Sequence, residues 1–236
     1  MSTVRILFLS LLLLAAGASP ALAQQTGAQE WLGNYRDAYQ ALIRFEKYGK
    51  PKHLIQQHLH IYTPDRPHPY DGLRLTLESK SLNVELPIDA AGRAVFPFQK
   101  AAYDENAALM LNRKTGTYTV RQRISLVPRA DGIYEVAELR AACEQALGFL
   151  RYTSDTLYRN WKCAGVRFSY VKGGAEPVVQ LRSDRGLRTL PVADGGAYWN
   201  DNGASYRTVT VKFTDLPDKG QVITQTVPLV VAPILE

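Results

Sequence analysis

Alternation of hydrophobic and polar residues predicts that most of this chain forms β-strands. The pattern is clearest after Gly72, where leucines at 73, 75 and 77 alternate with polar residues. Such a period of two is expected where one face of a sheet is buried and the other contacts solvent. Further strands are predicted over 58–62, 82–88, 94–98, 107–112, 118–126 and 221–233. Pro87 and Pro97 belong at strand ends, edges or bulges, because proline cannot donate to a central ladder.

The pattern of residues 72–98 returns in residues 165–192, which predicts a duplicated β unit. In this correspondence the leucines after Gly72 match Val166, Phe168 and Tyr170, and the 118–126 strand matches 206–213. The predicted fold class is mainly β with minor α: two tandem antiparallel β-sandwich-like units, each preceded by an amphipathic helix.

Two stretches carry apolar residues at steps of three and four, the spacing of a helix with one buried face. The first runs from Ala28 to Tyr48 and is followed by a glycine and a proline, which are helix stop signals. The second runs from Tyr134 to Leu150 and places Cys143 on its apolar face.

The N-terminus has the pattern of a secretory signal peptide. Arg5 precedes an apolar stretch over 6–16, and Ala21-Leu22-Ala23 provides a small-residue cleavage site. The apolar stretch is shorter than the roughly 20 residues that span a bilayer. We therefore expect cleavage near Ala23 and a periplasmic or secreted protein with no membrane span.

This reading divides the chain into five segments. They are a signal peptide (1–23), an N-terminal helical segment (24–52), a first β-sandwich unit (53–130), a helix and disulfide-linked connector (131–164) and a second β-sandwich unit (165–236).

The two cysteines, Cys143 and Cys163, both follow the predicted cleavage site. An even number of cysteines in an oxidising compartment favours a disulfide. The spacing is not the CxxC of a redox pair, and no nearby histidine completes a metal site. We predict that the bridge pins the second helix to the segment that enters the second β unit.

All four histidines, His53, His58, His60 and His68, lie within one short stretch. In a strand, His58 and His60 would point to the same side, and a following loop could add His68 to a copper or zinc site. A convincing completing carboxylate or thiolate is missing, although Asp65 and Asp71 are near in sequence. The alternative, which we favour, is a polar strand face without metal.

No sequence motif indicates catalysis. The chain has neither GxSxG nor HExxH, so acyl transfer and metalloprotease chemistry have no local support. A pair of carboxylates could still meet only in three dimensions, as in a glycosidase. We predict no catalytic residue and no cofactor.

The formal net charge of +6 is mild, and no run of basic residues suggests nucleic-acid binding. Arg74, Arg121, Arg123 and Arg167 are expected on the outward faces of their strands. They could form a basic patch for an acidic polymer or an envelope protein, or they could keep the sheet from adding stray strands, which we favour.

Two blocks, VELPIDAAGRAVFPF (84–98) and ALMLNRKTGTYTVRQRISL (108–126), resemble the strand, turn and hairpin segments of uncharacterised exported β-sandwich proteins of Gram-negative bacteria. The resemblance covers about residues 72–126. It implies a periplasmic location and a β-sandwich fold, and no site residue follows from it. The function expected from the sequence is a non-catalytic binding or structural module of the cell envelope. The alternatives are a periplasmic metal-binding protein that uses the histidines and an envelope hydrolase.

Overall fold

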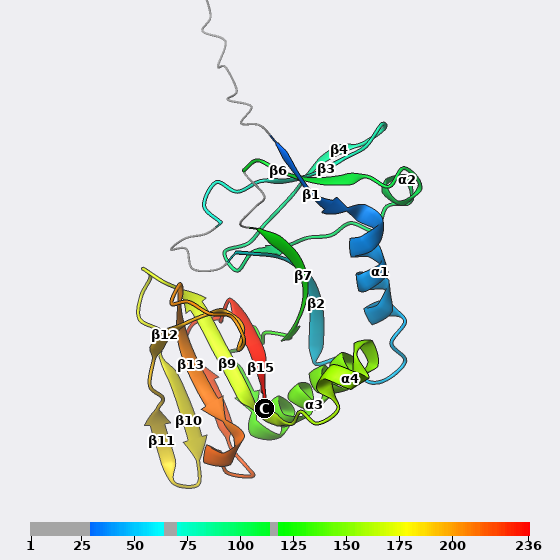
Figure 1. Ribbon diagram of the computed structural model, residues 1–236. Coiled ribbons are helices and arrows are strands. Elements are labelled where there is room, and N and C mark those ends of the chain that lie inside the picture. The colour runs from blue at the N-terminus through cyan, green and yellow to red at the C-terminus, as the bar shows by residue number, and fades with distance from the viewer. Residues whose placement is uncertain (1–28, 64–69, 114–117) are drawn as a thin grey trace, which may run out of the picture.

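The computed structural model describes residues 29–63, 70–113 and 118–236, and it is mainly β with a few helices (Figure 1). The strands of the first half are β1 (Glu30–Asn34), β2 (Ile55–Tyr62), β3 (Leu75–Glu78), β4 (Asn83–Leu86), β5 (Arg93–Ala94), β6 (Ala108–Leu111) and β7 (Thr119–Leu126). Those of the second half are β8 (Ile133–Glu135), β9 (Cys163–Val171), β10 (Val179–Ser183), β11 (Gly186–Thr189), β12 (Ala193–Gly195), β13 (Tyr206–Lys212), β14 (Gln221–Thr224) and β15 (Val230–Leu235). The helices are α1 (Tyr35–Glu46), α2 (Lys100–Asp104), α3 (Val136–Thr153), α4 (Asp155–Tyr158) and the 3-10 turn η2 (Phe213–Asp215).

A seven-stranded antiparallel sheet runs through both halves of the molecule. Its order is β12-β13-β9-β15-β7-β2-β5, and the halves meet where β15 pairs with β7 through Val231 and Leu126. Each half adds a four-stranded antiparallel sheet, with the orders β1-β6-β3-β4 and β11-β10-β14-β8. In Figure 1 the first of these lies at the top, and β10 and β11 of the second lie at the lower left.

Each half buries its own hydrophobic core against the seven-stranded sheet. In the first half, Leu59 of β2 packs in one cluster with Leu75 and Leu109 of the four-stranded sheet. In the second half, Phe168 of β9 packs with Leu181 of β10 in another cluster, to which α3 also contributes. The expected mainly β fold of antiparallel, sandwich-like units with minor α is therefore present.

The two halves repeat the same order of elements. β1 and α1 lead into β2, β3, β4 and β5 just as β8 and α3 lead into β9, β10, β11 and β12. The sheet order β1-β6-β3-β4 corresponds to β8-β14-β10-β11. The halves differ most between these elements and the next strand of the small sheet: α2 connects β5 to β6, whereas the long strand β13 lies between β12 and β14. The second half also adds α4 after α3 and η2 after β13.

The residue correspondence predicted for the repeat is wrong, although the topology repeats. The leucines after Gly72 enter β3 of a four-stranded sheet, but Val166, Phe168 and Tyr170 lie in β9 of the seven-stranded sheet. The strand that corresponds to β9 is β2. The error has a simple cause: half-buried strands share the same alternating pattern, so the pattern alone cannot identify equivalent strands.

Several predicted element boundaries also differ from the structure. The strand predicted over 94–98 ends at Ala94, the last residue of β5. The first helix does not begin near Ala28, because Trp31 and Leu32 lie in β1 and α1 starts at Tyr35. The second helix begins at Val136, since Tyr134 lies in β8. The segment 221–233 forms β14 and β15 with a break between them. Within the described ranges, the helices are all too short or too polar to cross a membrane.

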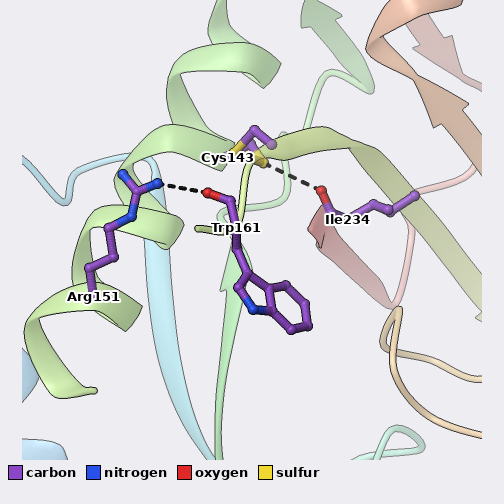
Figure 2. Close-up of a disulfide and its surroundings, with 5 residues drawn as sticks. Cys143, Arg151, Trp161 and Ile234 are labelled. Atoms are coloured by element: carbon purple, nitrogen blue, oxygen red, sulfur yellow. Dashed lines mark hydrogen bonds between the residues drawn. A yellow bond between two sulfur atoms is a disulfide. The ribbon is translucent and has the colours of Figure 1, made fainter. Parts of the chain in front are cut away.

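The predicted bridge between Cys143 and Cys163 is confirmed. Their sulfur atoms lie at bonding distance, and their Cα atoms are 5.9 Å apart. Figure 2 shows that the bridge joins α3 to the start of β9, beside the carbonyl of Ile234 on β15. Arg151 of α3 donates a 2.7 Å hydrogen bond to the carbonyl of Trp161, which fixes the same connection a second time.

Replacing both cysteines with alanine should lower the free energy of unfolding by about 3 kcal/mol, because the bridge closes a loop over a sequence separation of 20. Urea denaturation of Cys143→Ala/Cys163→Ala measures this loss. Reductant should lower the free energy of unfolding of the wild type by a similar amount. It should not change that of the double variant. Equal stability of wild type and variant under oxidising conditions would contradict a stabilising role.

Candidate functional site

The histidines of the sequence cluster occupy different environments. His58 and His60 lie on β2 and face the same side of the seven-stranded sheet, as the strand period requires. His53 is exposed in the segment before β2. His68 lies outside the described residues. No group of three or more histidine, cysteine or acidic side chains that could hold a metal occurs in residues 29–63, 70–113 and 118–236.

His60 is enclosed by protein groups. Only 1% of its surface is exposed, and the ring of Tyr198 lies 5.2 Å from it, centroid to centroid. Its Nδ1 accepts a long hydrogen bond of 3.5 Å from Nε of Arg123, and its Nε2 lies 3.4 Å from the hydroxyl of Tyr70. Burial, followed by the charge of Arg123, lowers the pKa of His60 to about 3. The imidazole is therefore a neutral part of a packed polar layer at pH 7.

His58 has one side-chain partner, the hydroxyl of Ser125 on β7, at 3.0 Å from its Nε2. Burial and the nearby charge of Arg93 lower the pKa of His58 to about 4. Unlike His60, His58 lines a cavity, which is described below.

A segment between β12 and β13 covers the polar face of the sheet. Asp201 forms an ion pair with Arg123, and the two side chains are only 8% and 11% exposed. Asn200 accepts a second hydrogen bond of 2.7 Å from the same guanidinium. Arg167 donates to the carbonyl of Tyr198 at 3.1 Å. Burial raises the pKa of Asp201, and the neighbouring Arg123 acts in the opposite direction.

The expectation that Arg123 and Arg167 face solvent is therefore wrong. Both strands do direct these side chains away from the hydrophobic core, but the covering segment buries them and supplies their partners. Arg121 is exposed on the same sheet, and Arg74 is exposed next to the first four-stranded sheet. The four arginines thus do not form one accessible basic patch.

A groove beside β2 has a volume of about 730 Å³. It lies between the last turn of α1, the edge of β2 and the chain around β5. Its apolar lining includes Leu42, Phe45, Val95, Phe96 and Phe98. We call this cavity the edge groove.

The edge groove combines apolar walls with a few polar groups. Val95 and Phe98 are 67% and 56% exposed, although both are large hydrophobic residues. Asp89 and Arg93 line the same space and form an ion pair of 2.6 Å with each other. A cavity of this size with mostly apolar walls and few polar groups is typical of ligand sites.

A tight turn holds the polar end of the groove. The carboxylate of Asp89 accepts 2.9 Å hydrogen bonds from the backbone N–H groups of Ala91 and Arg93. Gly92 has a φ of 76°, and a Cβ there would come within 2.3 Å of the Tyr70 ring. Only glycine fits this position, so the turn is fixed in the conformation that presents Asp89 and Arg93.

Most residues of the edge groove could not be found by sequence reasoning. They come from α1, β2, the turn before β5 and the segment after it, and the sequence predicts only an ordinary helix, strand or turn for each of these segments. The available signals were Pro87, which directly follows β4 as a strand end, and the hydrophobic residues that continue beyond β5. Pro97 lies in the irregular segment after β5, so the strand predicted over 94–98 is wrong beyond Ala94.

Comparison of the chain with protein-family models, with curated proteins and with solved structures found no match.

Neutral burial of His58 and His60 predicts that acid destabilises the protein. Both pKa values are lower in the folded state than the ordinary 6.5, so the unfolded state binds more protons as the pH falls below 6.5. Between pH 6.5 and pH 5, each histidine should remove about 2 kcal/mol of stability. Urea titrations between pH 6.5 and pH 5 should show that His58→Gln loses less free energy of unfolding than the wild type does. His53→Gln, at an exposed position, is the control and should behave as wild type.

Replacing Asp201 with asparagine should destabilise the fold by about 3 kcal/mol, because it leaves the buried guanidinium of Arg123 without a counter-charge. The matched control is Asp194→Asn, since Asp194 pairs with Lys172 at the surface and is 38% exposed. The free energy of unfolding of Asp194→Asn should fall by less than about 1 kcal/mol. Similar losses in the two variants, measured by thermal and urea unfolding, would contradict a special role for the buried pair.

Proposed function

We propose that the protein is a non-catalytic binding module of the bacterial cell envelope and that the edge groove is its binding site. The observation that carries this proposal is a groove of about 730 Å³ with exposed hydrophobic walls. Side chains such as Val95 and Phe98 lose contact with water when a ligand covers them, and this burial favours association. A structural role alone gives no reason for an open apolar groove.

The polar groups of the groove support binding over catalysis. Asp89 and Arg93 neutralise each other in the ion pair described above. His58 is uncharged at pH 7, because its pKa is about 4. Such groups orient a ligand through hydrogen bonds. They do not provide a pair of free carboxylates. The Ser125 hydroxyl beside His58 is fully buried and does not line the groove, so it is not placed to attack a ligand there.

The proposed location rests on the sequence and on the cysteines. The leader-like segment over 1–23 indicates export, and the bridge between Cys143 and Cys163 suits an oxidising compartment such as the periplasm. The ligand that we propose is an envelope component with an extended apolar surface. It replaces the acidic polymer that a basic patch of arginines would have bound.

The apolar dye N-phenyl-1-naphthylamine should bind wild-type protein saturably with an increase in fluorescence. Val95→Asp should weaken binding at least tenfold, because it places a charge in the apolar wall. The matched control is Val227→Asp, since Val227 is 54% exposed and lies outside the groove. Absence of saturable binding to wild type, or equal binding by the two variants, would overturn the groove as a binding site.

A further inference from the structure

We infer that the edge groove binds an extended polypeptide segment of a partner protein, which adds to the seven-stranded sheet as an antiparallel strand beside β2. This inference rests on the proposed function and names the chemistry of the ligand. Three observations carry it: an unpaired backbone edge, a strand that fills the equivalent position in the other half, and a cavity that opens on both faces of the sheet.

The edge of β2 is paired over only part of its length. β5 has two residues and pairs with Leu59 and His60, and the N–H of Ile61 donates to the carbonyl of Gly92 at 2.8 Å. Backbone groups of a strand alternate between its two sides, so the N–H and C=O of Gln57 point to the same side as those of Ile61. In the described part of the chain, no strand reaches Gln57 on that side.

The second half shows what occupies this position when it is filled. β9 corresponds to β2, and its outer neighbour β13 pairs with it along seven residues, from Tyr206 opposite Val171 to Lys212 opposite Gly165. In the first half the chain forms the short helix α2 at the place where the second half forms β13. The first half therefore lacks a strand of this length. β5 fills part of the position beside β2, at Leu59 and His60, and the edge groove lies along the rest of it.

The groove opens on both faces of the sheet, as a strand requires. The side chain of Gln57 faces α1 and donates to the carbonyl of Ala41 at 3.3 Å, whereas His58 faces the opposite side and contacts Ser125. Both Gln57 and His58 line the groove. An extended peptide directs alternate side chains to both faces, so it fits this shape. An acyl chain would need only one apolar channel.

The walls also specify the pattern of the partner strand. On the α1 side the groove presents Leu42 and Phe45, with Glu46 at the end of the helix, and on the other side it presents Gln56, His58 and the Asp89–Arg93 pair. The partner should therefore alternate apolar residues toward α1 with polar residues toward His58. β13 has this pattern: Val209 lies opposite Phe168 on the core side, and Thr210 lies opposite Arg167 on the polar side.

A synthetic peptide with the β13 sequence YRTVTVK, acetylated, amidated and fluorescently labelled, tests the inference by anisotropy. It should bind the full wild-type protein at one site. Gln57→Pro removes the unpaired N–H at a strand edge, where proline is tolerated, and should weaken binding at least tenfold. Gln57→Thr keeps the N–H and loses the side-chain hydrogen bond, so it should bind within about threefold of wild type. Circular dichroism and thermal unfolding confirm that both variants fold.

Hydrogen exchange provides an independent measurement, because the amide of Gln57 should exchange more slowly when the peptide is bound. A peptide with proline at the position of Val209 is the control ligand and should not bind. Equal peptide binding by Gln57→Pro and Gln57→Thr would overturn strand addition. Dye binding without peptide binding would also overturn it, while the groove would stand as an apolar binding site. Failure of both probes would overturn the proposed function itself.

Discussion

The pairing of β15 with β7 is the contact on which the architecture depends. Each half has its own core, but the ladder through Val231 and Leu126 turns two small sheets into one of seven strands. This pairing joins the inner strands of the two halves at one point, where the backbone groups of two strand edges would otherwise be unpaired. It leaves the outer edges different, with β12 beside the long β13 on one side and the short β5 on the other.

The seven-stranded sheet also explains the distribution of polar residues. One face packs on both hydrophobic cores, so the residues that alternate with the core positions gather on the other face. Several of them are charged or aromatic, including His60, Arg123 and Arg167. Covering them requires partners, since a buried charge without one is costly. The segment with Tyr198 and Asp201 supplies both a counter-charge and carbonyl acceptors.

The sequence was informative where a pattern has only one physical interpretation. The class of fold, the disulfide and the strand end at Pro87 followed from alternation, cysteine count and the missing N–H of proline. It was uninformative where patterns coincide: β3 and β9 both alternate, so the repeat was aligned on the wrong strands. Trp31 and Leu32 continued a helical stripe but belong to β1, because pairing with β6 outweighs local periodicity. The edge groove was inaccessible to sequence reasoning, since residues from four separate segments form it.

An open edge inside a protein needs a reason why it does not cause aggregation. Along β2, α1 lines one side of the free edge and the turn at Asp89 lines the other, so the edge lies inside a groove. The turn that ends at Gly92 limits β5 on one side, and Pro97 in the segment after β5 cannot donate to a ladder on the other. A single extended segment is narrow enough to enter between these walls, whereas a sheet edge with its neighbouring strands is not. The same geometry fits the single strand that we propose as the ligand, with apolar side chains toward α1 and polar ones toward His58.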